Sequence, residues 1–305
     1  MVRTGSVCNA SALESVSAPT FRTTMKRSTL LVVFAALAAC KKPAPTSSHT
    51  LFWAAEKAGK TTYLLGTMHV GVDAKTKLPV EVWKQLDAAP VFAMETDPAD
   101  PVMKTMAEPR DGSLHADLGD VYWQKLETEM TPAVAARLDH AKPVIAAVML
   151  SLKGLPETEP MDGALAAAAV AEKKPIVFLE PAAKQIGLLE KWLDARAIKA
   201  LLDHPAEAAA HDRDMLAAYL DGDEARMAAL AASERATAKA AGYTDAEYDQ
   251  EMTDLVYERN AAWIDAIEKL DNGAFVAVGA LHLIGPKSVL ELLAQRGYTV
   301  HRVDP

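Results

Sequence analysis

Two histidines follow glycine residues at the same spacing, near opposite ends of the chain. The first lies in TTYLLGTMH, residues 61–69, and the second in AFVAVGALH, residues 274–282. In each segment an apolar run rich in strand-forming residues leads to a glycine and then, three residues later, to His69 or His282. Imidazoles bind divalent metals and transfer protons near neutral pH. The repeated pattern therefore indicates two halves of one chemical site.

The glycines in this pattern, Gly66 and Gly279, explain how a polar ring can follow a buried strand. A strand packed on both faces cannot itself present a polar side chain to solvent, so the chain must first leave the sheet. Glycine permits the unusual backbone angles and the close approach needed at that exit. The spacing predicts that both histidines lie just beyond the carboxyl ends of their strands, where open α/β sheets bind ligands.

Two glutamates follow predicted strands in the same way. Residues 91–94 (VFAM) precede Glu95, and residues 175–179 precede Glu180. If the strands are parallel, these glutamates and the two histidines converge at one sheet edge. Each glutamate could instead stabilise the start of the helix that follows it, and each histidine could be an ordinary turn residue.

Such a convergence would allow metal-assisted hydrolysis. Two imidazoles and a carboxylate are a frequent ligand set for a divalent ion that keeps open positions for water and substrate. The ion lowers the pKa of its bound water and supplies hydroxide near neutral pH. A second carboxylate could then transfer the proton.

An arginine and an asparagine lie on the apolar face of a predicted helix near residues 256–270. Helical geometry places Arg259 and Asn260 on the stripe formed by Val256, Trp263, Ile264, Ile267 and Leu270. A buried guanidinium is costly without a partner. Arg259 therefore either forms a structural ion pair with Glu180 or Asp162, or faces the site and binds an oxyanion or a substrate carboxylate.

The remaining pattern predicts an α/β fold of layered helices around a central, largely parallel sheet. Residues 51–55 and 61–65 flank Gly59 and predict an N-terminal hairpin. Residues 182–270 are almost wholly helical by periodicity and alanine content, which predicts a large helical insertion that forms a wall or lid over the site. With 305 residues, half of them hydrophobic, the chain can bury a full core.

The first 50 residues precede the predicted domain. Met25 begins a short basic segment, and the ten apolar residues 30–39 are too few to span a bilayer but typical of a signal peptide. The LAAC sequence ending at Cys40 resembles a bacterial lipobox, although an ordinary cleaved signal with a coincidental cysteine is the alternative. We expect the following parts: 1–24 upstream of the true start, 25–39 a lipoprotein signal peptide, 40–50 a lipidated tether, and 51–305 the domain.

Cysteine content and charge limit the chemistry and the partners. Cys8 lies before the signal and Cys40 would carry lipid, so neither can serve as nucleophile or metal ligand. Residues 1–39 hold four of the 32 basic and one of the 41 acidic residues, so the mature chain would carry 28 and 40, a net charge of −12. That sign disfavours nucleic acid as a partner. Lys41 after the cysteine favours anchoring in the bacterial outer membrane, with the domain in the periplasm or at the cell surface.

Five segments together resemble the TraB/GumN family, to which the TIKI metalloproteases and the pheromone-shutdown proteins are related. They are YLLGTMHVG, the glutamate of VFAMETD, FLEPAAKQ, VYERNAAW and VGALHLIGPKSVLELLAQRGYTV, in the order and spacing of the family. The resemblance implies a fold similar to the erythromycin esterase and ChaN group, with Mn²⁺, Co²⁺ or Zn²⁺ held by both Gly-x-x-His motifs and a glutamate. Carried onto this chain, those ligands are His69, Glu95 and His282, and the Arg-Asn pair of the family is Arg259 and Asn260.

Two functions remain open on the sequence. The first is a metal-dependent hydrolase, with peptidase as the favoured reaction, that acts on a peptide or protein in the cell envelope. The second is a non-catalytic lipoprotein that sequesters a peptide or a haem-like ligand in the same pocket. A spare base, Glu180, beside Arg259 favours the enzyme, because a binding protein has no need of one next to a metal.

Overall fold

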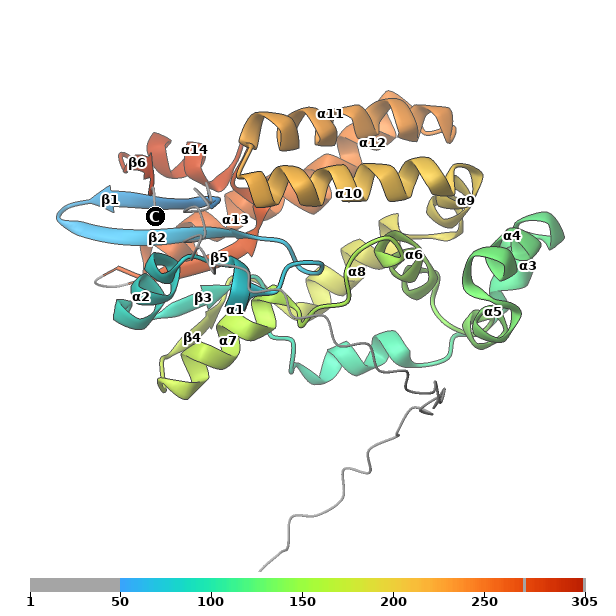
Figure 1. Cartoon of the computed structure of the whole chain (residues 1–305), viewed down its shortest axis with the longest axis horizontal. Helices are drawn as coiled ribbons and strands as arrows, with labels where there is room; N and C mark the ends of the chain where they lie inside the picture. The colour runs from blue at the N-terminus through green and yellow to red at the C-terminus, as the bar shows by residue number, and fades with distance from the viewer. Residues whose placement is uncertain (1–49, 271–272, 304–305) are drawn as a thin grey trace, which may run out of the picture. The chain divides into compact units, whose positions relative to one another are not determined.

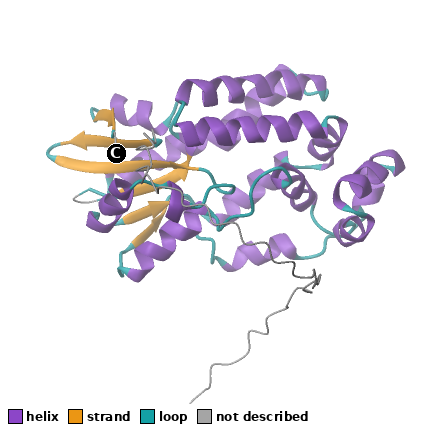
Figure 2. Cartoon of the chain, in the orientation of Figure 1, coloured by secondary structure: helices purple, strands orange, loops and turns teal. Residues whose placement is uncertain are grey.

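The structure, a computed structural model, describes residues 50–270 and 273–303 (Figure 1). The predicted signal peptide, the lipidation site Cys40 and nearly all of the predicted tether lie outside the described residues. Strands gather in one sheet and helices surround it (Figure 2). Among the described residues, no helix combines the length and the apolar character needed to cross a membrane.

Six strands form one mixed sheet in the order β4-β3-β5-β2-β1-β6. They are β1 (Phe52–Lys57), β2 (Lys60–Thr67), β3 (Phe92–Met94), β4 (Ile176–Phe178), β5 (Phe275–Gly279) and β6 (Thr299–Arg302). The four neighbours β4, β3, β5 and β2 run parallel, whereas β1 pairs antiparallel with β2 and with β6. The predicted α/β fold with a largely parallel central sheet is therefore confirmed.

Strands β1 and β2 form the predicted N-terminal hairpin. Their two turn residues, Ala58 and Gly59, have φ values of 52° and 76°. A two-residue turn with both φ angles positive matches the twist of the flanking strands and favours glycine at its second position. The pairing sets Phe52 opposite Leu65, and both of these side chains are buried in the main core.

Helices make up most of the remaining chain. They are α1 (Ala74–Lys77), α2 (Val80–Ala88), α3 (Leu114–Leu118), α4 (Asp120–Met130), α5 (Pro132–Leu138), α6 (Pro143–Leu152), α7 (Met161–Ala171), α8 (Ala182–Trp192), α9 (Ala195–Asp203), α10 (Pro205–Asp221), α11 (Glu224–Ala240), α12 (Asp245–Met252), α13 (Glu258–Glu268) and α14 (Val289–Gln295). Two 3-10 helices, η1 (Pro101–Ala107) and η3 (Ala280–His282), and one π-helix, η2 (Thr253–Tyr257), complete the set. The apolar run of residues 144–152 is helical and belongs to α6.

The helices cover both faces of the sheet. Helices α2 and α7 lie on one face, and α13 and α14 lie on the other (Figure 1), the arrangement expected for right-handed crossovers in this strand order. The largest fully buried side chains include Phe92 and Phe275 from the sheet, Leu165 from α7 and Trp263 from α13. This core holds the carboxyl ends of the parallel strands in fixed positions.

The helical region after β4 does not form a unit by itself. Helix α9, from that region, packs with α3, α4 and α6, which precede β4. Together they bury a second apolar cluster that includes Leu126, Ala147 and Ile198. Helices α10 and α11 instead lie side by side as a long hairpin (Figure 1). The predicted insertion therefore divides its helices between two cores, and its helices α8 and α13 reach the sheet edge.

Candidate functional site

Parallel strands bring the four predicted side chains to one edge of the sheet. Glu95 directly follows β3, and Glu180 follows β4 by two residues. His69 lies two residues beyond β2, and His282 three residues beyond β5. The Glu180 backbone N–H donates to the Glu95 carbonyl at 2.9 Å, so strand pairing continues up to the two glutamates. All four residues thus lie at the carboxyl edge of the parallel strands.

Gly279 lies at the point where three of these side chains meet. A methyl group added to its Cα would lie 3.2 Å from His69 Nε2, 3.4 Å from Glu95 Oε1 and 3.5 Å from His282 Cδ2. Groups from three strands therefore border one small space that exists because residue 279 has no side chain. Its φ is −51°, an angle open to any residue, so this position needs glycine for space alone.

Gly66 lets the two motif segments approach each other closely. A methyl group here would lie 3.1 Å from the Cα of Ala280 and 3.3 Å from the Cβ of Leu51. Neither motif glycine has a positive φ. The prediction of unusual backbone angles at these glycines is therefore wrong, and the predicted close approach is confirmed. The Tyr219 hydroxyl donates to the Gly66 carbonyl at 2.9 Å and fixes this exit from the strand.

Glu95 is a buried carboxylate with a donor on each oxygen. Its Oε1 accepts from the Gly279 backbone N–H at 2.8 Å, and its Oε2 accepts from Arg259 at 2.6 Å and from Gln185 at 3.0 Å. Burial alone would raise the pKa of Glu95, but the neighbouring histidines, Arg259 and the Gly279 N–H lower it to about 2. Glu95 is therefore ionised and able to hold a cation at neutral pH.

Arg259 links both glutamates. Its Nη2 lies 2.6 Å from Glu95 Oε2 and 2.6 Å from Glu180 Oε1, and its Nε donates to the same Glu180 oxygen at 2.8 Å. Its Nη1 donates to the Leu255 carbonyl at 2.9 Å and to His282 Nε2 at 3.2 Å. The two carboxylates raise the pKa of Arg259 against the effect of burial. The expected inward orientation is found, together with the ion pair to Glu180 that a structural role would require.

Asn260, the residue after Arg259, holds His282 in one tautomer. Asn260 Oδ1 lies 2.6 Å from His282 Nδ1, and Asn260 Nδ2 donates to the Lys287 carbonyl at 2.9 Å. Because Nη1 of Arg259 can only donate, Nε2 of His282 must carry a lone pair. Burial, with a further contribution from the arginine charge, lowers the pKa of His282 to about 4. Asn260 is fully buried and engaged at both ends, a geometry that suits a role in positioning His282.

His69 has an orienting partner that the sequence did not identify. Its Nδ1 lies 2.7 Å from Oδ2 of Asp162, whose other oxygen accepts from Thr67 Oγ1 at 2.8 Å. The His69 side chain is 62% exposed and that of Asp162 is 16% exposed. Desolvation alone would lower the pKa of His69, but the hydrogen bond and the charge of Asp162 raise it to about 9. In the sequence Asp162 lies in the first turn of a helix-prone segment, where an acid is expected for the helix alone.

Among the described residues, only one of the two carboxylate oxygens of Glu180 accepts hydrogen bonds. Its Oε1 receives two donors from Arg259, but its Oε2 is buried and has no hydrogen-bond partner among the described residues. Lys184 Nζ lies 3.5 Å from that oxygen. Glu180 is therefore hydrogen-bonded to Arg259 through Oε1, whereas Oε2 makes the longer ion pair with Lys184.

A π-helical turn carries Arg259 into the site. Asp254, in η2, accepts hydrogen bonds from Lys191, Trp192 and Gln250 at 2.5 to 2.9 Å and fastens the turn to α8. A π turn inserts one residue into a helix and shifts the face presented by the residues that follow. Helix α13 begins directly after it and buries Arg259 in its first turn.

The donor set suits a divalent metal ion in residue type and in ring orientation. His69 and His282 each contact an oxygen through Nδ1, an arrangement that directs Nε2 at a metal and fixes the tautomer. Glu95 Oε1 borders the same space at Gly279. Within residues 50–270 and 273–303, however, no three His, Cys, Asp or Glu side chains form a ready metal-binding group. The cation in contact with Glu95 and His282 is the Arg259 guanidinium.

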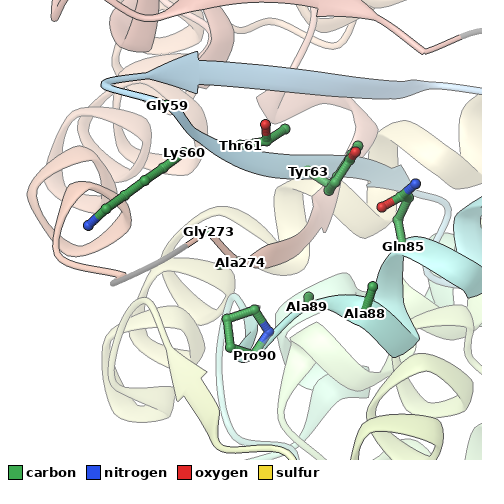
Figure 3. A pocket seen from close by; sticks show the side chains of 10 residues that line it. All are labelled: Gly59, Lys60, Thr61, Tyr63, Gln85, Ala88, Ala89, Pro90, Gly273 and Ala274. Carbon is green, nitrogen blue, oxygen red and sulfur yellow. The ribbon is translucent and has the colours of Figure 1, made fainter.

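A separate cavity lies at the opposite end of the parallel strands (Figure 3). Thr61 and Tyr63 at the start of β2 line it, together with Ala274 just before β5 and with Pro90. Its volume is about 350 Å³. None of the four predicted site residues lines it, so it is distinct from the carboxyl-edge site.

Comparisons with known proteins agree with the family resemblance of the sequence. The sequence model of the TraB/PrgY/gumN family matches residues 51–302 of the chain. The uncharacterized protein YbaP of Shigella flexneri is 25% identical over 244 residues, which cover 76% of this chain and 87% of that protein. No solved structure matches the chain significantly. The family match spans both Gly-x-x-His motifs, both glutamates and the Arg-Asn pair, and the chain therefore belongs to the TraB/PrgY/gumN family.

Proposed function

We propose that this protein is a metal-dependent hydrolase of the bacterial cell envelope, with a peptide or protein as substrate. The observation that carries the proposal is the convergence of His69 Nε2, Glu95 Oε1 and the His282 ring around the empty side-chain position of Gly279. Three side chains of the types that bind metal ions, from three strands, thus border one polar space. Their approach supports a role in holding a ligand.

The residues that would hold the ion are His69, Glu95 and His282. A divalent ion bound there would lower the pKa of a water molecule and provide hydroxide near neutral pH. Glu95 supplies the permanent negative charge, because its lowered pKa keeps it ionised. Both imidazoles are orientated through Nδ1, so their Nε2 atoms are fixed before any ligand arrives.

Arg259 is the group we assign to the substrate oxyanion. Its guanidinium lies beside Glu95 and His282 and is fixed by a carbonyl and two carboxylates. A preorganised donor at a developing negative charge typically contributes a factor on the order of 10² to 10³ in turnover. Glu180 holds Arg259 through Oε1, and the proton-transfer role expected of it stays a prediction. Asn260 acts by positioning His282.

The proposed location follows from the chain before the domain. A lipid on Cys40 would anchor the protein in the outer membrane and leave the acidic domain free in the periplasm or at the cell surface. Peptides and proteins of the envelope are then the accessible substrates.

Metal analysis of the purified, tag-free mature protein tests the proposal. The parent should take up about one equivalent of Mn²⁺, Co²⁺ or Zn²⁺ and cleave members of a peptide library in its presence. His69→Ala and His282→Ala should abolish uptake. His301→Ala, on the exposed side of the edge strand β6, is the matched control and should change neither property. Full metal content in either site variant would remove that histidine from the site, and metal uptake without any cleavage would favour the binding lipoprotein instead.

A further inference from the structure

Arg259 occupies two of the groups on which the proposed metal site depends. Its Nη2 donates to Glu95 Oε2 at 2.6 Å, and its Nη1 donates to the lone pair of His282 Nε2 at 3.2 Å. A histidine nitrogen that accepts a hydrogen bond cannot donate the same lone pair to a metal ion. A metal ion bound by His282 must therefore displace the Arg259 Nη1 contact.

Charge also opposes simultaneous occupation. Arg259 and Glu95 are both buried, so water screens their interactions poorly. A divalent ion next to Glu95 would be the largest charge in the site and would repel a guanidinium in contact with the same carboxylate. A buried guanidinium that loses one partner needs another, because an uncompensated buried charge is strongly destabilising.

Glu180 provides that second partner. Its Oε1 already receives Nε and Nη2 of Arg259, at 2.8 and 2.6 Å. Its Oε2 is buried and has no hydrogen-bond partner in the described part of the chain. An Arg-carboxylate pair is strongest when both oxygens receive donors. The free oxygen therefore leaves Glu180 able to take up the guanidinium more fully.

We propose that Arg259 is a resident cation that holds Glu95 and His282 while no metal is bound, and that metal binding transfers it to Glu180. This inference rests on the proposed metal site and adds its regulation: the protein exchanges an internal cation for an external one. The exchange keeps the buried carboxylates paired in both states. Glu180 acts in this process as a positioning residue for Arg259.

A double-mutant cycle on Zn²⁺ affinity tests the exchange. The variants are Arg259→Gln, which removes the competing cation, Glu180→Gln, which removes the receiving charge at nearly constant shape, and the pair combined. Lys184→Met is the charge-matched control, because Lys184 is also a cation near Glu180 but contacts neither Glu95 nor His282. Each Kd is measured by equilibrium dialysis with elemental analysis, and the fold of each variant is checked by thermal unfolding.

The exchange predicts opposite effects for the two single variants. Arg259→Gln should tighten Zn²⁺ binding roughly tenfold beyond Lys184→Met, and Glu180→Gln should weaken it roughly tenfold, within the range measured for coupled neighbours. In the Arg259→Gln background the Glu180 substitution should have almost no effect, because the arginine that it receives is gone.

Four results would overturn the exchange, and the last of them also ends the proposed function. Equal weakening by Glu180→Gln in both backgrounds would mean that Glu180 contacts the ion itself. Binding by Arg259→Gln no tighter than by Lys184→Met would mean that the arginine does not compete. If Arg259→Gln fails to fold, parent-like affinity of the Glu180→Gln single variant overturns the exchange. A parent protein that binds no Zn²⁺, Mn²⁺ or Co²⁺ removes the metal site together with the exchange.

Discussion

The space at Gly279 allows the candidate site to be blocked by a single methyl group. In Gly279→Ala the new Cβ would lie 3.2 Å from His69 Nε2, 3.4 Å from Glu95 Oε1 and 3.5 Å from His282 Cδ2. The methyl group would thus occupy the volume in which a shared ligand of these three groups must lie. We expect Zn²⁺ binding to be lost in this variant.

The same variant should remain folded. The φ of −51° is open to alanine, and replacing glycine at a compatible position restricts the unfolded chain, which stabilises by about 0.4 to 1 kcal/mol. The nearest atom belongs to His69, an exposed side chain that can shift by the few tenths of an ångström required. The two effects oppose each other, so the free energy of unfolding should change by less than about 1 kcal/mol.

Gly66→Ala is the matched control, because it adds the same methyl group at the equivalent motif position. Its Cβ would meet the Cα of Ala280 at 3.1 Å and the Cβ of Leu51 at 3.3 Å, atoms close to the backbone that cannot move independently. Overpacking of this kind costs about 1 to 3 kcal/mol. We therefore expect Gly66→Ala to lose stability and Gly279→Ala to lose metal binding.

The two properties are measured separately. Urea unfolding followed by far-UV circular dichroism gives the free energy of unfolding, and equilibrium dialysis gives Zn²⁺ affinity. A folded Gly279→Ala protein that binds Zn²⁺ as tightly as the parent would refute the assignment of this space to a ligand. A loss of stability in Gly279→Ala as large as in Gly66→Ala would refute the claim that the side chains around Gly279 can shift to make room for the methyl group.

Three further predictions address other parts of the chain. Asp162→Asn should keep the fold but weaken Zn²⁺ binding roughly 10-fold to 100-fold, the usual effect of losing a carboxylate that orients a metal-bound histidine, and parent-like affinity in dialysis would exclude this role. In the metal-free protein the pKa of His282 is lowered from 6.5 to about 4, so the unfolded state takes up a proton first as pH falls. The contribution of His282 to stability should be complete above pH 6.5 and decline towards pH 4 by on the order of 3 kcal/mol, a decline that His282→Gln should remove in urea titrations. Cys40→Ser should release the protein from the membrane fraction, and a variant that stays membrane-bound would place the anchor elsewhere.

Local sequence was sufficient to predict the strands and the edge at which the site forms. Strand periodicity and the Gly-x-x-His spacing are properties of short segments, and parallel strands necessarily bring their carboxyl ends to one edge. His69, Glu95, Glu180 and His282 lie there as expected. The hairpin around Gly59 was equally local, because its turn chemistry is contained in two residues.

The partners of those residues required the tertiary structure. Asp162 lies 93 positions from His69, and Arg259 lies 164 positions from Glu95, so no local pattern records either contact. An acid in a first helical turn and an arginine on an apolar stripe each have ordinary local explanations. Only packing of α7 and α13 against the sheet decides which charges meet.

The role of the motif glycines also became clear only from the tertiary structure. The sequence identified Gly66 and Gly279 as the residues that end the two apolar runs before the histidines, but it offered both backbone freedom and close approach as reasons. The fold selects close approach, because Gly66 abuts Ala280 and Gly279 borders His69, Glu95 and His282. The order of residues thus determined which groups reach the edge, whereas the distances between them, and the cation that lies among them, depend on long-range packing that only the folded chain contains.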